Sequence, residues 1–140
     1  MLDKTGIIKR LALADRNATR ELEQWRGLSD ADPSAFAESI RRYTLCKFLL
    51  DDEEPVPASH NLQELAMLSV EKAGRLNPNE ATLLDVSRHC GATSSYMTKK
   101  VLLLMALSKW FGISYEPYNT ADIETTDELA RVILEKVNNA

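Results

Sequence analysis

The sequence predicts an all-α protein, and three observations carry this prediction. Apolar residues recur at steps of three and four along several segments, as on one face of an amphipathic helix. No segment of strand length alternates apolar and polar residues well enough to compete with these helical patterns. Residues with the chemistry of helix ends divide the chain, among them Pro33, Gly112 and the segment 125–128. A chain of 140 residues is long enough to bury a core without disulfides or metals.

The segment 99–113, KKVLLLMALSKWFGI, is the predicted centre of the fold. Every residue from 101 to 107 is apolar, so the run covers almost the whole circumference of a helix. We therefore expect this helix to be buried on all sides, with Trp110 in the core. A buried strand is the competing interpretation, but good helix formers dominate the run and Gly112 suits a helix C-terminus.

Two helices are predicted before residue 51. The second starts with Asp32 as its N-cap and Pro33 at its first helical position, and runs to about residue 50. The first spans 5–25, with one apolar face made of Ile7, Leu11, Ala14, Ala18, Leu22 and Trp25.

An acidic run at 51–54, followed by Pro55 and Pro57, then breaks the chain. Carboxylates at a helix C-terminus oppose the helix dipole, and proline cannot continue a helix. This break predicts a boundary between an N-terminal helical extension, 1–57, and a second helical domain, 58–140. A surface loop and a flexible linker are both compatible with the run.

Three further helices are predicted around the central one. Ser59 caps a helix over 59–76, and a capping box opens another over 77–90. A polar loop occupies 114–124. A second capping box at 125–128 starts the last helix, whose buried face comprises Leu129, Ala130, Ile133 and Val137.

Composition and motifs exclude several functional classes. The net charge of −4 disfavours a nucleic-acid binder that uses its whole surface. Cys46 and Cys90 form no CxxC motif, the apolar run is too short to span a membrane, and the N-terminus lacks a signal-peptide core, so we expect a cytoplasmic protein. No phosphate-binding loop, zinc-protease motif or nucleophile elbow occurs. The His89–Cys90 pair has no other Cys or His near it in the sequence, so a site there would need the fold to bring in His60 or Cys46. We therefore expect no enzyme activity and no metal site.

The segment 105–137 resembles the second half of acyl carrier proteins. In that family a central helix ends in an M-A-L-x-x-x-F type sequence, and a loop with a short helix, an I-x-T turn and a last helix follow. This chain keeps that spacing without a gap at Met105, Ala106, Leu107, Phe111, Ile123 and Thr125. With 59–76 standing in for the family's first helix, the resemblance covers about 59–140. It implies an acyl-carrier-like helical bundle with two extra N-terminal helices.

The resemblance implies carriage of an acyl or aminoacyl group on a 4′-phosphopantetheine arm, in lipid or secondary metabolism. In the family, a serine at the start of the central helix, within G-x-D-S-L, holds the arm, and partner enzymes of an acyl or aminoacyl transfer pathway act on the cargo. Here the segment 91–94, GATS, makes Ser94 the candidate attachment residue, whereas the ungapped register places Met97 there. A carrier loaded on Ser94 and a scaffold without the arm both remain open.

The central helix also departs from the family in charge, because it starts with Lys99 and Lys100 where an acidic face is usual. A partner that docks by electrostatic complementarity would therefore use another surface than the family's. For a carrier, we expect four apolar side chains of this helix to line the space between the helices, namely Leu102, Leu103, Met105 and Leu107.

Two other functions are compatible with the sequence. Residues 80–101 have helix-turn-helix spacing, and Ser94, Ser95, Thr98 and Lys99 would face a major groove in such a DNA-binding protein. The second alternative is a helical protein-interaction module, which predicts neither an attached arm nor DNA binding.

Overall fold

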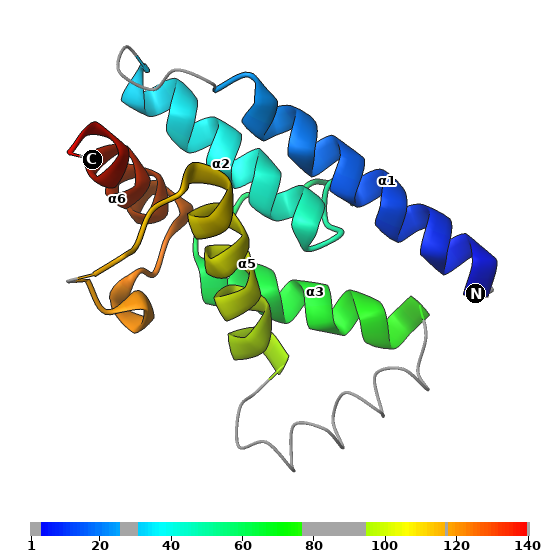
Figure 1. Ribbon diagram of the computed structural model, residues 1–140. Helices are drawn as coiled ribbons and strands as arrows, with labels where there is room; N and C mark the ends of the chain where they lie inside the picture. The colour runs from blue at the N-terminus through cyan, green and yellow to red at the C-terminus, as the bar shows by residue number, and fades with distance from the viewer. Residues whose placement is uncertain (1–3, 26–30, 77–94, 117, 140) are drawn as a thin grey trace.

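The computed structural model describes residues 4–25, 31–76, 95–116 and 118–139 (Figure 1). In these ranges the chain forms α-helices, one short 3-10 helix and no strand, which confirms the predicted all-α class. The predicted helix over 77–90 lies outside the described residues. The helices are α1 (Lys4–Glu23), α2 (Pro33–Lys47), α3 (Leu62–Leu76), α5 (Ser95–Phe111), η1 (Thr120–Asp122) and α6 (Thr126–Asn138).

The helix starts confirm two predicted caps and correct a third. Asp32 occupies the N-cap of α2, directly before Pro33. Thr125 Oγ1 accepts a hydrogen bond from the backbone N–H of Glu128 at 3.1 Å, as in the predicted capping box of α6. The prediction that Ser59 caps the third helix is wrong, because the backbone enters the helix two residues later. Asn61 takes this role in α3, where its Oδ1 accepts from the N–H of Glu64 at 2.9 Å.

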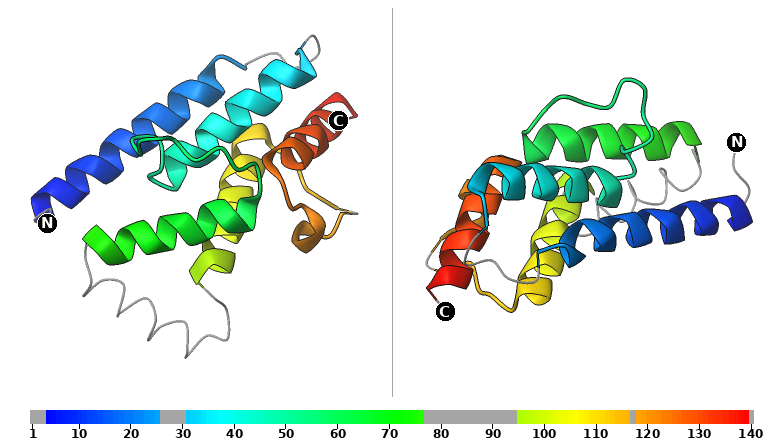
Figure 2. Two further views of the ribbon diagram at one scale, coloured as in Figure 1. Left: turned by 180° about the vertical axis from the view of Figure 1, so that it is seen from behind. Right: turned by 90° about the horizontal axis from the view of Figure 1, so that it is seen from above.

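One hydrophobic core joins the two N-terminal helices to the rest of the chain. α2 packs between α1 and α6, while α3 packs on α5 (Figures 1 and 2). Phe36 of α2 is fully buried and meets the ring of Trp25 at 5.2 Å and that of Phe111 at 5.8 Å, both edge to face. The core thus contains residues from both sides of position 57, and the division of the chain there stays a prediction. Its most buried members include Leu22, Ile40, Leu62, Leu65, Leu103, Leu107, Leu129 and Ile133.

α5 is buried on one side only, so the prediction of burial on all sides is wrong. Leu103 and Leu107 lie in the core with 2% and 0% of their surface exposed. Leu102 and Met105 are 57% and 60% exposed, and Trp110 lies largely outside the core at 46%. The apolar run does cover the helix circumference, but the described neighbours that pack on α5 cover only one of its sides.

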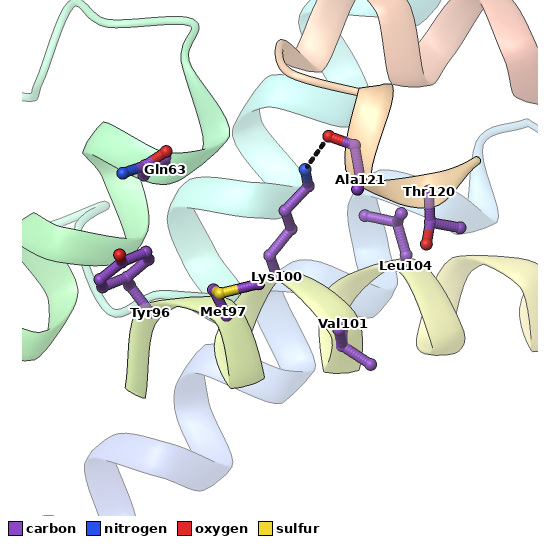
Figure 3. Close-up of a pocket in the computed structure, with 8 residues that line it drawn as sticks. All are labelled: Gln63, Tyr96, Met97, Lys100, Val101, Leu104, Thr120 and Ala121. Carbon is purple, nitrogen blue, oxygen red and sulfur yellow. Dashed lines mark hydrogen bonds between the residues drawn. The ribbon is translucent and has the colours of Figure 1, made fainter. Parts of the chain in front are cut away.

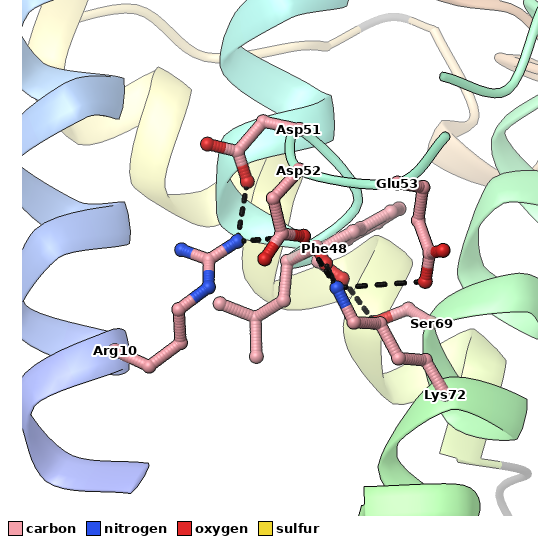
Figure 4. A network of polar contacts seen from close by, with 8 residues as sticks. Arg10, Phe48, Asp51, Asp52, Glu53, Ser69 and Lys72 are labelled. Carbon is pink, nitrogen blue, oxygen red and sulfur yellow. Dashed lines mark hydrogen bonds and ion pairs between the residues drawn. The ribbon is translucent and has the colours of Figure 1, made fainter. Parts of the chain in front are cut away.

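The acidic run after α2 is held by cations from two other helices (Figure 4). Arg10 of α1 contacts Asp51 at 2.6 Å and Asp52 at 3.1 Å. Lys72 of α3 donates to Asp52 and to the carbonyl of Leu49, both at 2.5 Å. We call these five residues the loop clamp. It explains how carboxylates follow a helix C-terminus: the two cations offset their repulsion with the helix dipole.

The loop clamp lowers the pKa of Asp52. Partial burial by itself would raise the pKa of this carboxyl group, but the hydrogen bonds from Lys72 and Arg10 outweigh burial and hold the pKa below its ordinary value of 3.8. The acidic run is therefore a tethered loop that ties α1 and α3 to the end of α2.

One-sided burial of α5 predicts unequal effects of truncation along its apolar run. Leu107→Ala removes a fully buried side chain and is expected to lower the free energy of unfolding by about 2–5 kcal/mol. Met105→Ala, on the exposed side, is the matched control and should change it by less than about 0.5 kcal/mol. Urea unfolding measures both, and equal losses would contradict the observed orientation of α5.

The loop clamp predicts a stability difference that depends on pH. Since the folded-state pKa of Asp52 is depressed, its contribution is complete above the unfolded value near 4 and is lost as the pH falls through the folded value. Asp52→Asn should therefore lower stability at pH 7, and the deficit should close in acid. Because the side chain is half exposed, the deficit should not exceed about 1 kcal/mol.

Urea unfolding of the Asp52→Asn variant between pH 7 and about pH 2 checks this expectation. Glu71→Gln, an exposed carboxyl group next to Lys72 in the sequence, is the control and should show no such closing gap. A deficit that is constant across the pH range would argue against a depressed pKa at Asp52.

Candidate functional site

A pocket lies beside the first turns of α5, between α3 and η1 (Figure 3). We call it the α5 pocket. Its volume is about 330 Å³, at the lower end of the range in which proteins hold small ligands. The side chains that line it are Gln63, Tyr96, Met97, Lys100, Val101, Leu104, Thr120 and Ala121.

Hydrogen bonds at both ends of η1 fix the wall that it contributes. Asn119 Oδ1 caps η1 by accepting from the N–H of Ala121 at 3.0 Å. Beyond η1, the N–H of Leu62 donates to the carbonyl of Glu124 at 2.8 Å. The N–H of Thr126 donates to the carbonyl of His60 at 2.9 Å. These bonds join the start of α3 to the segment between η1 and α6, so two of the walls of the pocket are tied to each other through the backbone.

The described lining of the α5 pocket is mainly apolar and contains one charged group. Leu104 is buried, whereas Val101 stands on the exposed side of α5. The side chain of Lys100 reaches from α5 toward η1, where its ammonium donates to the carbonyl of Ala121 at 3.3 Å (Figure 3). Within the part of the chain that the structure describes, no carboxylate forms an ion pair with Lys100.

A second pocket, of about 350 Å³, lies between α5 and the end of α2. Burial lowers the pKa of Lys99, which lines this pocket. Lys47, on the α2 side, pairs with Asp15 of α1 at 2.9 Å. Lys99 is therefore withdrawn from the open surface of α5, which weakens its use as a contact to DNA. The remaining lining residues are Phe48, Leu102, Leu103 and Ala106.

The exposed side of α5 forms a third feature, which we call the outer face. Val101, Leu102 and Met105 are 48%, 57% and 60% exposed and lie within two turns of one another. α5 contains three lysines and no acidic residue, although the chain as a whole carries a net charge of −4. The outer face therefore consists of apolar side chains on a helix that carries a net positive charge.

The structure places the predicted carrier residues in different surroundings. Ser94 lies outside the described residues, and α5 is described from Ser95, the next residue in the sequence. Leu103 and Leu107 face the core between the helices, as predicted. The same prediction is wrong for Leu102 and Met105, which are exposed because the described helices pack only on the opposite side of α5.

Most of the predicted helix-turn-helix, 80–94, also lies outside the described residues. Its remaining part, 95–101, coincides with the first turns of α5. There Lys99 is partly buried, and Lys100 contacts the carbonyl of Ala121.

The described residues contain no group of three or more His, Cys, Asp or Glu side chains that could hold a metal ion. Burial raises the pKa of the Cys46 thiol to about 11, which keeps it protonated near neutral pH. His60 Nδ1 contacts Asp127 at 3.1 Å.

No described helix is long and apolar enough to span a membrane.

Comparison with protein-family models, curated proteins and solved structures finds no match to this chain. Sequence reasoning also missed the α5 pocket, because Gln63, Lys100 and Ala121 come from three separate segments. A local signal for its η1 wall existed in Asn119, a residue type that favours turns and caps.

Proposed function

We propose that this chain is an acyl-carrier-like module that holds an acyl or aminoacyl group with the apolar part of the cargo in the α5 pocket. One observation carries the proposal: an apolar pocket adjoins the start of α5. The resemblance places the attachment residue at the start of this helix, and Ser94 directly precedes the described part of α5 in the sequence.

The order of the described elements after residue 58 supports the same proposal. A helix over Leu62–Leu76 precedes the long helix α5, and the 3-10 helix η1 and the last helix α6 follow it. A short helix between the central and last helices is what the resemblance implies. In this chain, that short helix supplies one wall of the pocket.

The proposed role of the chain is to bind and present cargo, and partner enzymes carry out the chemistry. At the start of the central helix, where the resemblance puts the attachment residue, a phosphodiester would benefit from the positive end of the helix dipole. Moving the aliphatic part of the cargo from water into the pocket would contribute about 25 cal/mol per Å² of apolar surface. Burial in the pocket would shield the thioester-linked chain from water until a partner enzyme withdraws it.

The proposal predicts covalent loading at one serine. Co-expression with a broad-specificity phosphopantetheinyl transferase should raise the intact mass of the chain by one phosphopantetheine. Ser94→Ala should abolish this gain, because the hydroxyl that forms the phosphodiester is removed. Ser95→Ala is the matched control and should keep it.

Intact mass spectrometry of the three proteins decides the question. A mass gain that persists in Ser94→Ala would show that the arm is attached to another residue. The absence of a mass gain in the wild-type chain would exclude the loaded carrier. The scaffold without an arm would then be the remaining form of the proposal.

The outer face of α5 favours a second candidate, the helical protein-interaction module. Contiguous exposed apolar side chains frequently mark surfaces that bind other proteins. Val101, Leu102 and Met105 form such a group on a helix with three lysines. This candidate predicts no mass gain with the transferase, so the same measurement separates it from the loaded carrier.

A further inference from the structure

We propose that the α5 pocket binds free aliphatic carboxylic acids without a covalent bond, and that the ammonium of Lys100 receives the carboxylate. This inference shares the pocket with the proposed function but needs neither Ser94 nor a phosphopantetheine arm. The ligand class is a short or medium-length hydrocarbon chain with one negative charge at its end.

The first argument is the incomplete bonding of the Lys100 ammonium. Its contact to the carbonyl of Ala121 is 3.3 Å long, beyond the usual distance for such a bond. An ammonium has three donors, so at least two remain for a ligand. Two other described lysines contrast with it: Lys47 pairs with Asp15 and Lys72 with Asp52. Lys100 has no such carboxylate among the described residues.

The second argument is the surroundings of this ammonium. Leu104 and the side chains of Tyr96, Met97 and Val101 give the pocket a mainly apolar wall on the α5 side (Figure 3). Beside the buried Leu104, water screens an ion pair less than on an open surface, while Met97 and Val101 leave the pocket partly open. A charge-assisted hydrogen bond to a carboxylate is roughly twice as strong as a bond between neutral groups.

The third argument concerns which anion fits. Among the described residues that line the pocket, Lys100 is the one cationic side chain, and most of the others offer carbon atoms. A polyphosphate needs several cations, whereas a monocarboxylate needs one and brings a chain that the apolar wall can cover. The pocket volume of about 330 Å³ limits the chain to a short or medium length. Gln63, on the α3 side, supplies an amide that can donate a second hydrogen bond.

Calorimetric titration with octanoate and octanol tests the inference, because the two ligands differ in charge but share the chain length. We expect the wild-type protein to bind octanoate about tenfold more tightly than octanol, as one charge-assisted hydrogen bond would give. Lys100→Met should remove this preference while the affinity for octanol stays within about twofold. Lys100→Arg should restore much of it, since the positive charge is kept.

Lys109→Met is the matched control, because this lysine is exposed on the same helix and does not line the pocket. It should behave as the wild type. Ser94→Ala should also bind octanoate normally, because no covalent step is involved. Urea unfolding of every variant verifies that each protein is folded before its affinity is compared.

Three results would overturn the inference: equal affinity for octanoate and octanol, a preference that survives Lys100→Met, or no binding of octanoate at millimolar concentration. Its failure is distinct from failure of the proposed carrier function, which the mass gain on Ser94 decides. Octanoate binding without a mass gain would leave this inference standing alone. A mass gain without a preference for octanoate would leave only the carrier.

Discussion

Phe36 of α2, buried against Phe111 of α5 beside the packing of α2 on α6, joins the N-terminal helices to the core of the later ones. Phe36 is fully buried, with Trp25 at the end of α1 against its ring on another side. Burying an aromatic ring of this kind is among the largest single contributions that a core receives. Through Phe36 the two N-terminal helices share the core of the later helices. The orientation of α5 follows, because the side that carries Leu103 and Leu107 must face the same core.

Once that side of α5 is committed to the core, its other residues divide between two pockets and an exposed surface. Leu104, Lys100 and Tyr96 face α3 and η1, where the α5 pocket lies. Leu102 and Met105 remain exposed. The same apolar run thus supplies part of the core, one wall of a pocket and the outer face, and the functional proposals all concern this one helix.

The cationic side chains also fall into two groups, those paired with carboxylates and those beside apolar pockets. In the loop clamp, Arg10 and Lys72 hold the carboxylates that follow α2, which fastens α1 and α3 to this loop. On α5, by contrast, Lys99 and Lys100 line apolar pockets and form no ion pair among the described residues. An ammonium next to apolar walls gains most from an anion that arrives with a ligand, since the described residues place no carboxylate against it.

The sequence by itself determined the helical class, the confirmed caps Asp32 and Thr125, and the position of the long apolar helix. These features depend on local periodicity, on the proline that follows Asp32 and on the bond from the Glu128 N–H to the Thr125 side chain, so they can be read without the fold. The Ser59 cap failed because Asn61, two residues later, offers a competing side-chain acceptor to the same helix end. The carrier hypothesis depends on Ser94, and the attachment of an arm to this residue stays a prediction from the sequence.

Only the tertiary structure decided which side of α5 is buried, since a run of seven apolar residues has no hydrophilic side to mark the solvent. It also decided that the acidic run is clamped, because Arg10 and Lys72 lie 41 and 20 residues away from the carboxylates that they bind. The α5 pocket required three segments to meet, at Gln63, Lys100 and Ala121. The periodicity of apolar residues indicates which side of a segment faces a core. It does not indicate which residues, far away in the sequence, complete a pocket beside that segment.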